Sequence, residues 1–64
     1  MGRSKVSAAK ANLMADITTV ISELGAAKSD LTSQSGVHAE ELKGKIDTTI
    51  TNYTILKGRV NALQ

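Results

Sequence analysis

The feature that most constrains this chain is an apolar residue at every third or fourth position, a spacing that keeps apolar side chains on one face of an α-helix. In the first half the stripe consists of Val6, Lys10, Leu13, Ile17, Val20, Leu24, Ala27 and Leu31. Only Lys10 interrupts its apolar character. In the second half it consists of Ala39, Leu42, Ile46, Thr49, Tyr53, Leu56, Val60 and Leu63. Alternating steps of three and four are the heptad pattern of a coiled coil, so the sequence predicts two long amphipathic helices.

A polar cluster separates the two stripes. Residues 32–36 read Thr-Ser-Gln-Ser-Gly, and Gly36 can take the positive φ that ends a helix at low cost. Ser4 and Ser35 are expected to cap the first and the second helix, because a serine hydroxyl accepts a hydrogen bond from the free amides of a first turn. The two stripes are one residue out of phase, which disfavours a single continuous helix.

These patterns predict an all-α fold with one domain, a two-helix antiparallel coiled-coil hairpin. The expected helices cover about 4–31 and about 37–63, and the expected turn covers about 32–36. In the heptad notation abcdefg the stripes occupy positions a and d, with Ile17 and Ile46 at a. The seam between the helices is therefore expected to run through the a and d positions of both.

Charges beside the stripes favour the antiparallel orientation. Position g carries Asp16, Glu23 and Asp30 in the first helix, and Lys45, Asn52 and Arg59 in the second. In an antiparallel pair g faces g, which would place Asp16 against Arg59 and Asp30 against Lys45. Each exposed pair contributes about 0.5 kcal/mol, so these charges are expected to set the orientation more than the stability.

Apolar residues at position e, namely Met14, Ile21 and Ile50, widen each stripe beyond what a two-helix seam would bury. A chain of 64 residues without cysteine has a thin core and no disulfide to stabilise it. We therefore expect oligomerisation into a helical bundle, with a second copy or another helical protein as partner. The residues expected to make these contacts are Leu13, Met14, Ile17, Val20, Ile21, Leu24, Leu31, Leu42, Ile46, Ile50, Tyr53, Leu56, Val60 and Leu63.

Catalytic and ligand-binding chemistry finds little support in the sequence. His38 is the only histidine and there is no cysteine, which leaves too few ligands for a metal site. No phosphate-binding loop or nucleophile motif stands in the chain, so we expect neither an enzyme nor a cofactor. The net charge of +2 is spread over both halves, and Tyr53 is the only aromatic residue. This combination disfavours nucleic acid as a partner.

Four short segments resemble the soluble helical part of the bacterial ElaB/YqjD-type family: 13–17 (LMADI), 20–23 (VISE), 33–36 (SQSG) and 41–46 (ELKGKI). Members of that family are small ribosome-associated proteins tethered to the inner membrane, so the resemblance implies ribosome association. The family's C-terminal membrane helix is absent, because the sequence has no run of about 20 apolar residues. No signal-peptide pattern is present either, and we expect a cytoplasmic location.

Four functions are compatible with these patterns. The first is a non-enzymatic interaction or assembly module that acts by coiled-coil self-association or partner binding. The second is a repeating structural subunit of a filament or phage-type particle, with an outer strip of Gly44, Thr51 and Gly58 as an additional contact. The third is an adaptor that binds a ribosome or an anionic surface through lysines of the second helix. The fourth is a small secreted hairpin of the WXG type, although the tryptophan is missing from 33–36.

Overall fold

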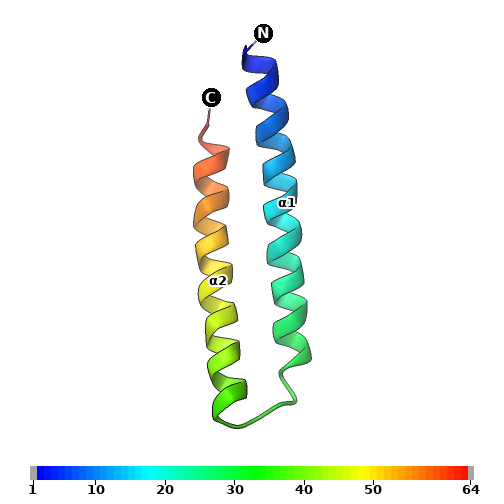
Figure 1. The fold of residues 1–64 in the computed structure, drawn as a ribbon, viewed down its shortest axis with the longest axis vertical. Coiled ribbons are helices and arrows are strands. Elements are labelled where there is room, and N and C mark those ends of the chain that lie inside the picture. Colours follow the sequence, from blue (N-terminus) through cyan, green and yellow to red (C-terminus); the bar gives the residue numbers. More distant parts are fainter. Residues whose placement is uncertain (1, 64) are drawn as a thin grey trace.

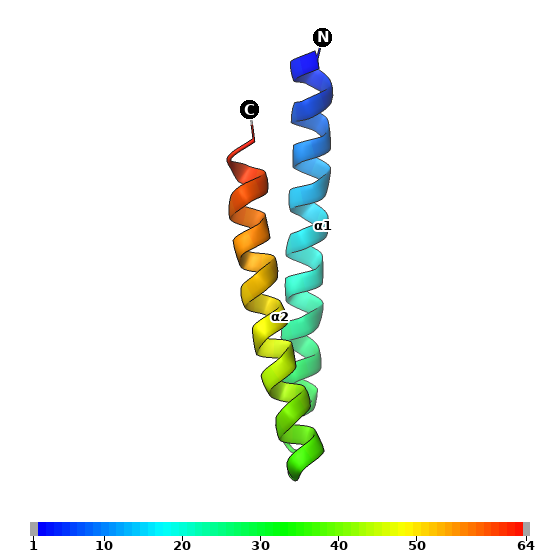
Figure 2. The same cartoon turned by 60° about the vertical axis from the view of Figure 1, so that its left-hand side comes forward.

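Two helices pack side by side in the computed structural model, which describes residues 2–63 and, of their side chains, those of residues 5–63. Helix α1 spans Gly2–Asp30 and helix α2 spans Val37–Asn61. Figures 1 and 2 show that the helices run in opposite directions, with both chain ends at the same end of the hairpin. The hairpin measures 54 × 15 × 11 Å. The predicted all-α antiparallel hairpin is confirmed.

Helix α1 ends through its own backbone. The amide of Leu31 donates to the carbonyl of Lys28 (3.0 Å), and the amide of Thr32 donates to Ser29 (3.1 Å). The Thr32 hydroxyl also donates to the Ser29 carbonyl (2.6 Å). These tighter bonds, from one residue to the third before it, satisfy carbonyls that the last turn of an α-helix leaves free.

Gly36 directly precedes α2 as its N-cap, so its expected role at the end of α1 needs correction. Its backbone has φ 112° and ψ 168°, a conformation that is essentially restricted to glycine. It occupies the N-cap position, and its carbonyl accepts the amide of Glu40 at 3.0 Å. Ser35 is therefore not the cap, and no side chain caps α2. Helix α1 starts at Gly2, upstream of the expected cap Ser4, whose side chain lies outside the described part.

The contact between the helices is narrow. Among the described side chains only Ile17, Ile46 and Val60 are buried, with 3%, 8% and 5% of their surface exposed. Half-buried residues continue the contact along both helices, and they are Lys10, Met14, Val20, Ile21, Leu24, Lys28, Leu31, Ala39, Lys43, Thr49, Ile50, Tyr53 and Lys57. From residue 10 to residue 60 every a and e position is buried or half-buried, whereas of the d positions only Val20 and Thr49 are.

The seam therefore runs through a and e, and the expected a and d register needs correction. Apolar side chains stand at both d and e, and a single partner helix covers only one of these two flanks. Rotation toward e places Ile21 and Ile50 half-buried in the seam. It also brings Lys28 to Asp47, where the Lys28 Nζ donates to Asp47 Oδ1 at 2.6 Å. Met14 stands at e as well. It was expected on a flank that the hairpin leaves uncovered, but it is half-buried between the helices.

Candidate interaction face

Large apolar side chains at the d positions lie outside the seam. Leu13, Leu42, Leu56 and Leu63 were expected in the seam, but they are 44%, 48%, 41% and 51% exposed. Val6, also at a d position, is 41% exposed. These side chains are available for a contact that the hairpin itself does not make.

All d positions lie on the same side of the hairpin. In an antiparallel pair, equivalent flanks of the two helices face the same side of the plane that contains both axes. The ion pair between Lys28 at e and Asp47 at b marks one side, and the d positions lie on the other. We call that other side the leucine face, formed by Val6, Leu13, Val20, Leu42, Leu56 and Leu63.

Two contacts across the hairpin determine which residues of the leucine face are neighbours. Lys28 lies beside Asp47 near the turn, and Lys10 lies beside Leu63 near the chain ends. We use level for the height of a residue along the long axis of the hairpin. Interpolation between these two contacts, at a rise of 1.5 Å per helical residue, places the level of Leu13 between those of Leu56 and Leu63. Side chains of α1 and α2 therefore alternate along the leucine face.

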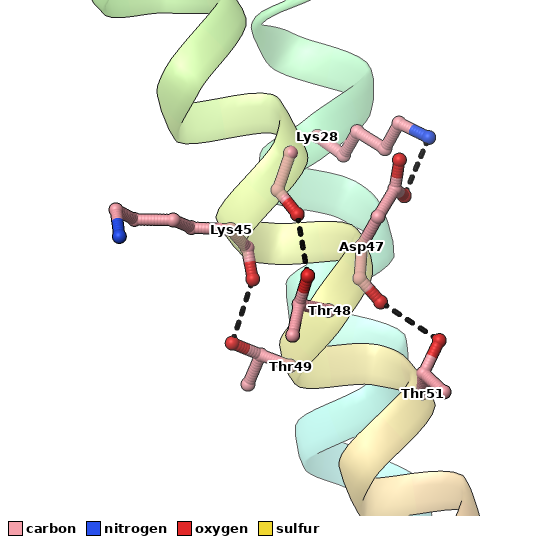
Figure 3. A network of polar contacts seen from close by, with 7 residues as sticks. Lys28, Lys45, Asp47, Thr48, Thr49 and Thr51 are labelled. Atoms are coloured by element: carbon pink, nitrogen blue, oxygen red, sulfur yellow. Dashed lines mark hydrogen bonds and ion pairs between the residues drawn. The ribbon is translucent and has the colours of Figure 1, made fainter.

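The polar position within the leucine face is compatible with an apolar contact. Thr49 stands at d, and its hydroxyl donates to the Lys45 carbonyl at 2.8 Å (Figure 3). The same bond, from the hydroxyl to the fourth residue before, is made by Thr18, Thr19, Thr48, Thr51 and Thr54. Because the Thr49 proton is already bonded within α2, burial of Thr49 would leave no unsatisfied donor.

Charged residues border the leucine face with opposite signs. The α1 edge carries Asp16, Glu23 and Asp30 at g, and the α2 edge carries Lys45 and Arg59 at g; all five are exposed. Figure 3 shows Lys45 extending from α2 on the side opposite to the Lys28–Asp47 pair. The leucine face thus has an apolar centre, an acidic edge and a basic edge.

The ion pairs expected between these edges do not form within the hairpin. Rotation of the seam toward e carries the g positions away from it, so Asp16 does not pair with Arg59, nor Asp30 with Lys45. In the described residues the ion pairs are Lys28–Asp47 (2.6 Å) and Lys43–Glu40 (3.0 Å). Five charges that were expected to orient the two helices are consequently free to contact another molecule.

A lysine side chain bonds to a backbone carbonyl at each end of the hairpin. Lys10 interrupts the apolar stripe, and its Nζ donates to the Leu63 carbonyl at 3.1 Å, just beyond α2. At the other end the Lys43 Nζ donates to the Gln34 carbonyl in the turn at 2.9 Å. Lys10 therefore lies at the C-terminal end of α2, where the helix dipole favours positive charge. Lys43 also pairs with Glu40 at 3.0 Å, and Lys28 pairs with Asp47, so each of these two lysines at e has an acidic partner.

The hairpin exposes more surface than its mass requires. Its accessible surface is 4879 Å², compared with about 3900 Å² for a compact monomer of 6.7 kDa. Its radius of gyration is 15.3 Å, compared with about 11 Å for a compact domain of this length. The difference in surface is of the same order as the roughly 800 Å² that each partner contributes to a standard protein interface.

Within residues 2–63 no three acidic, histidine or cysteine side chains gather as a metal site would require. Neither described helix combines the length and hydropathy that a membrane span needs. A comparison with protein-family models, with characterised proteins and with solved structures finds no match for this chain.

Proposed function

We propose that this chain is a helical interaction module that acts by self-association through the leucine face. The observation that carries this proposal is the set of large apolar side chains, 41–51% exposed, on one side of a hairpin whose own core contains three buried residues. Contiguous apolar surface bordered by polar residues is typical of protein interaction sites. The hairpin would complete its core by covering this face, as helices do in a four-helix bundle.

The energetics favour association that depends on concentration. Complete burial of a leucine side chain contributes about 1.5–3 kcal/mol, so each half-exposed side chain of the leucine face could add about 1 kcal/mol. Two copies of Val6, Leu13, Leu42, Leu56 and Leu63 would together contribute on the order of 10 kcal/mol. Association costs about 4–15 kcal/mol in lost translational and rotational freedom, so the balance is close and oligomers should dissociate on dilution.

Leu56→Lys tests this proposal, with Ile55→Lys as its matched control. Leu56 and Ile55 are neighbours in α2 with 41% and 51% of their surface exposed, but Ile55 stands at c, outside the leucine face. Both substitutions add the same charge to the same helix. We expect sedimentation equilibrium to show that Leu56→Lys lowers the average mass toward that of the monomer, while Ile55→Lys retains the wild-type mass.

A wild-type monomer at all concentrations, or the same mass for Leu56→Lys and Ile55→Lys, would show that the leucine face does not mediate self-association. Circular dichroism on the same samples separates lost association from lost helix. Growth of the wild type beyond a discrete oligomer would instead favour an open-ended structural assembly.

A further inference from the structure

We propose that the second copy binds with its hairpin rotated about a twofold axis parallel to the helices, so that α1 of each copy lies over α2 of the other. This inference rests on the proposed self-association through the leucine face and adds the geometry of the dimer. It is carried by the signs of the two edges and by their levels along the hairpin. Homodimers most commonly have twofold symmetry, in which the same surface contacts itself.

Two twofold arrangements bring one leucine face onto another. In the first, the axis runs parallel to the helices, and α1 of one copy covers α2 of its partner. In the second, the axis lies across the hairpin, and α1 covers α1 while α2 covers α2. The first arrangement places the acidic edge of Asp16, Glu23 and Asp30 over the partner's basic edge. The second places acidic edge over acidic edge, and like charges at an interface disfavour that orientation.

The levels of the charges agree with the first arrangement. Within one hairpin the Lys28–Asp47 contact places Asp30 at about the level of Lys45, and Asp16 at about the level of Arg59. Rotation about an axis parallel to the helices keeps every residue at its level. Asp16 would therefore lie across from Arg59 of the partner subunit, and Asp30 across from Lys45 of the partner subunit. The pairs that the hairpin does not form become pairs between copies.

The apolar centre is consistent with the same arrangement. Because Leu13 lies at a level between Leu56 and Leu63, it would enter the gap between these two residues of the partner subunit. Val20 would likewise lie at a level between Thr49 and Leu56 of the partner subunit. Alternation of this kind is the knobs-into-holes packing of antiparallel helices in bundles. Neighbouring helices would be antiparallel both within each copy and between copies.

A charge-swapped chain distinguishes the two arrangements. The variant Asp16→Arg, Asp30→Lys, Lys45→Asp and Arg59→Asp exchanges the signs of the edges and has the same composition as the wild type. It should self-associate as the wild type does, because each edge still meets its opposite. In a mixture with the wild type, acidic would meet acidic and basic would meet basic. We expect mixed dimers to be at least about tenfold depleted at low salt relative to a random mixture.

Native mass spectrometry of the mixture, with one chain labelled with ¹⁵N, measures this directly. Separate wild-type and swapped dimers would support the inference. Enrichment of mixed dimers would overturn the inference in favour of the second arrangement, in which α1 covers α1. A random mixture would show that the charged edges do not orient the dimer. Either result would leave the proposed self-association intact. Monomers of the wild type would overturn the proposed function itself.

Cysteine cross-linking tests the same geometry without changing most of the charges. The chain has no cysteine, so single substitutions report only on contacts between copies. A mixture of Asp16→Cys and Arg59→Cys chains should form a covalent heterodimer on mild oxidation several-fold faster than a mixture of Asp16→Cys and Asp30→Cys chains. Faster cross-linking of the second mixture would indicate that α1 lies over α1 and would overturn the inference.

Discussion

At the scale of single residues, the effect of replacing a glycine on the free energy of unfolding depends on the backbone conformation of that glycine. Gly36 has φ 112° and ψ 168°, which a residue with a Cβ adopts only at a cost of about 1–3 kcal/mol. Gly58 lies within α2, and a Cβ added there would have no neighbouring atom within 4 Å. The same substitution should therefore have opposite effects at these two positions.

We predict that Gly36→Ala lowers the free energy of unfolding by about 1–3 kcal/mol because of backbone strain. Gly58→Ala should raise it by about 1 kcal/mol, because alanine is the better helix former and meets no obstruction. Thermal or urea denaturation followed by circular dichroism would measure both. A loss of stability for Gly58→Ala would indicate that the strip of Gly44, Thr51 and Gly58 contacts another molecule.

At the scale of the helices, the a and e register gives side chains of the same apolar stripe very different exposure to solvent. Ile17 is 3% exposed at the centre of the seam, while Leu13, four residues earlier, is 44% exposed. An a and d seam would bury both. The effect of truncating each residue therefore reports which face of α1 contacts α2.

We predict that Ile17→Ala removes most of the helical signal at concentrations at which the chain is monomeric. Large-to-small substitutions of buried aliphatic residues cost about 2–5 kcal/mol, and a hairpin with three buried residues has little stability to lose. Under the same conditions Leu13→Ala should cost less than about 1 kcal/mol, because its side chain is half exposed. Equal losses of ellipticity for the two variants would contradict the a and e register.

At the scale of the whole molecule, folding and association are expected to be coupled. The hairpin is elongated, 54 Å by 15 Å by 11 Å, and it leaves its leucine face uncovered. A partner that binds only the folded chain stabilises it by an amount that grows with the logarithm of the partner's concentration. Stability should consequently be a property of the dimer more than of the isolated hairpin.

We predict that the midpoint of thermal unfolding of the wild type rises by about 5 °C for each tenfold increase in protein concentration, given typical unfolding entropies for a dimer of this size. Leu56→Lys should show almost no dependence on concentration, since it blocks the leucine face, and Ile55→Lys should behave as the wild type. Melting curves recorded by circular dichroism over a hundredfold range of concentration would provide the measurement. A wild-type midpoint that does not change would exclude coupled folding and association.

The sequence by itself determined the two helices and the break between them, because apolar periodicity and the polar segment 32–36 are local properties. The antiparallel orientation was also predicted correctly, but the pairs Asp16–Arg59 and Asp30–Lys45 that favoured it do not form within the hairpin. The residues of the leucine face could also be named from the sequence, but Leu13, Leu42, Leu56 and Leu63 were assigned to the seam. Only the tertiary structure decided which flank was buried. Both d and e are apolar, so periodicity alone defines a stripe that is wider than one helix covers. The packed hairpin half-buries Met14, Ile21 and Ile50 at e and leaves the leucines at d exposed.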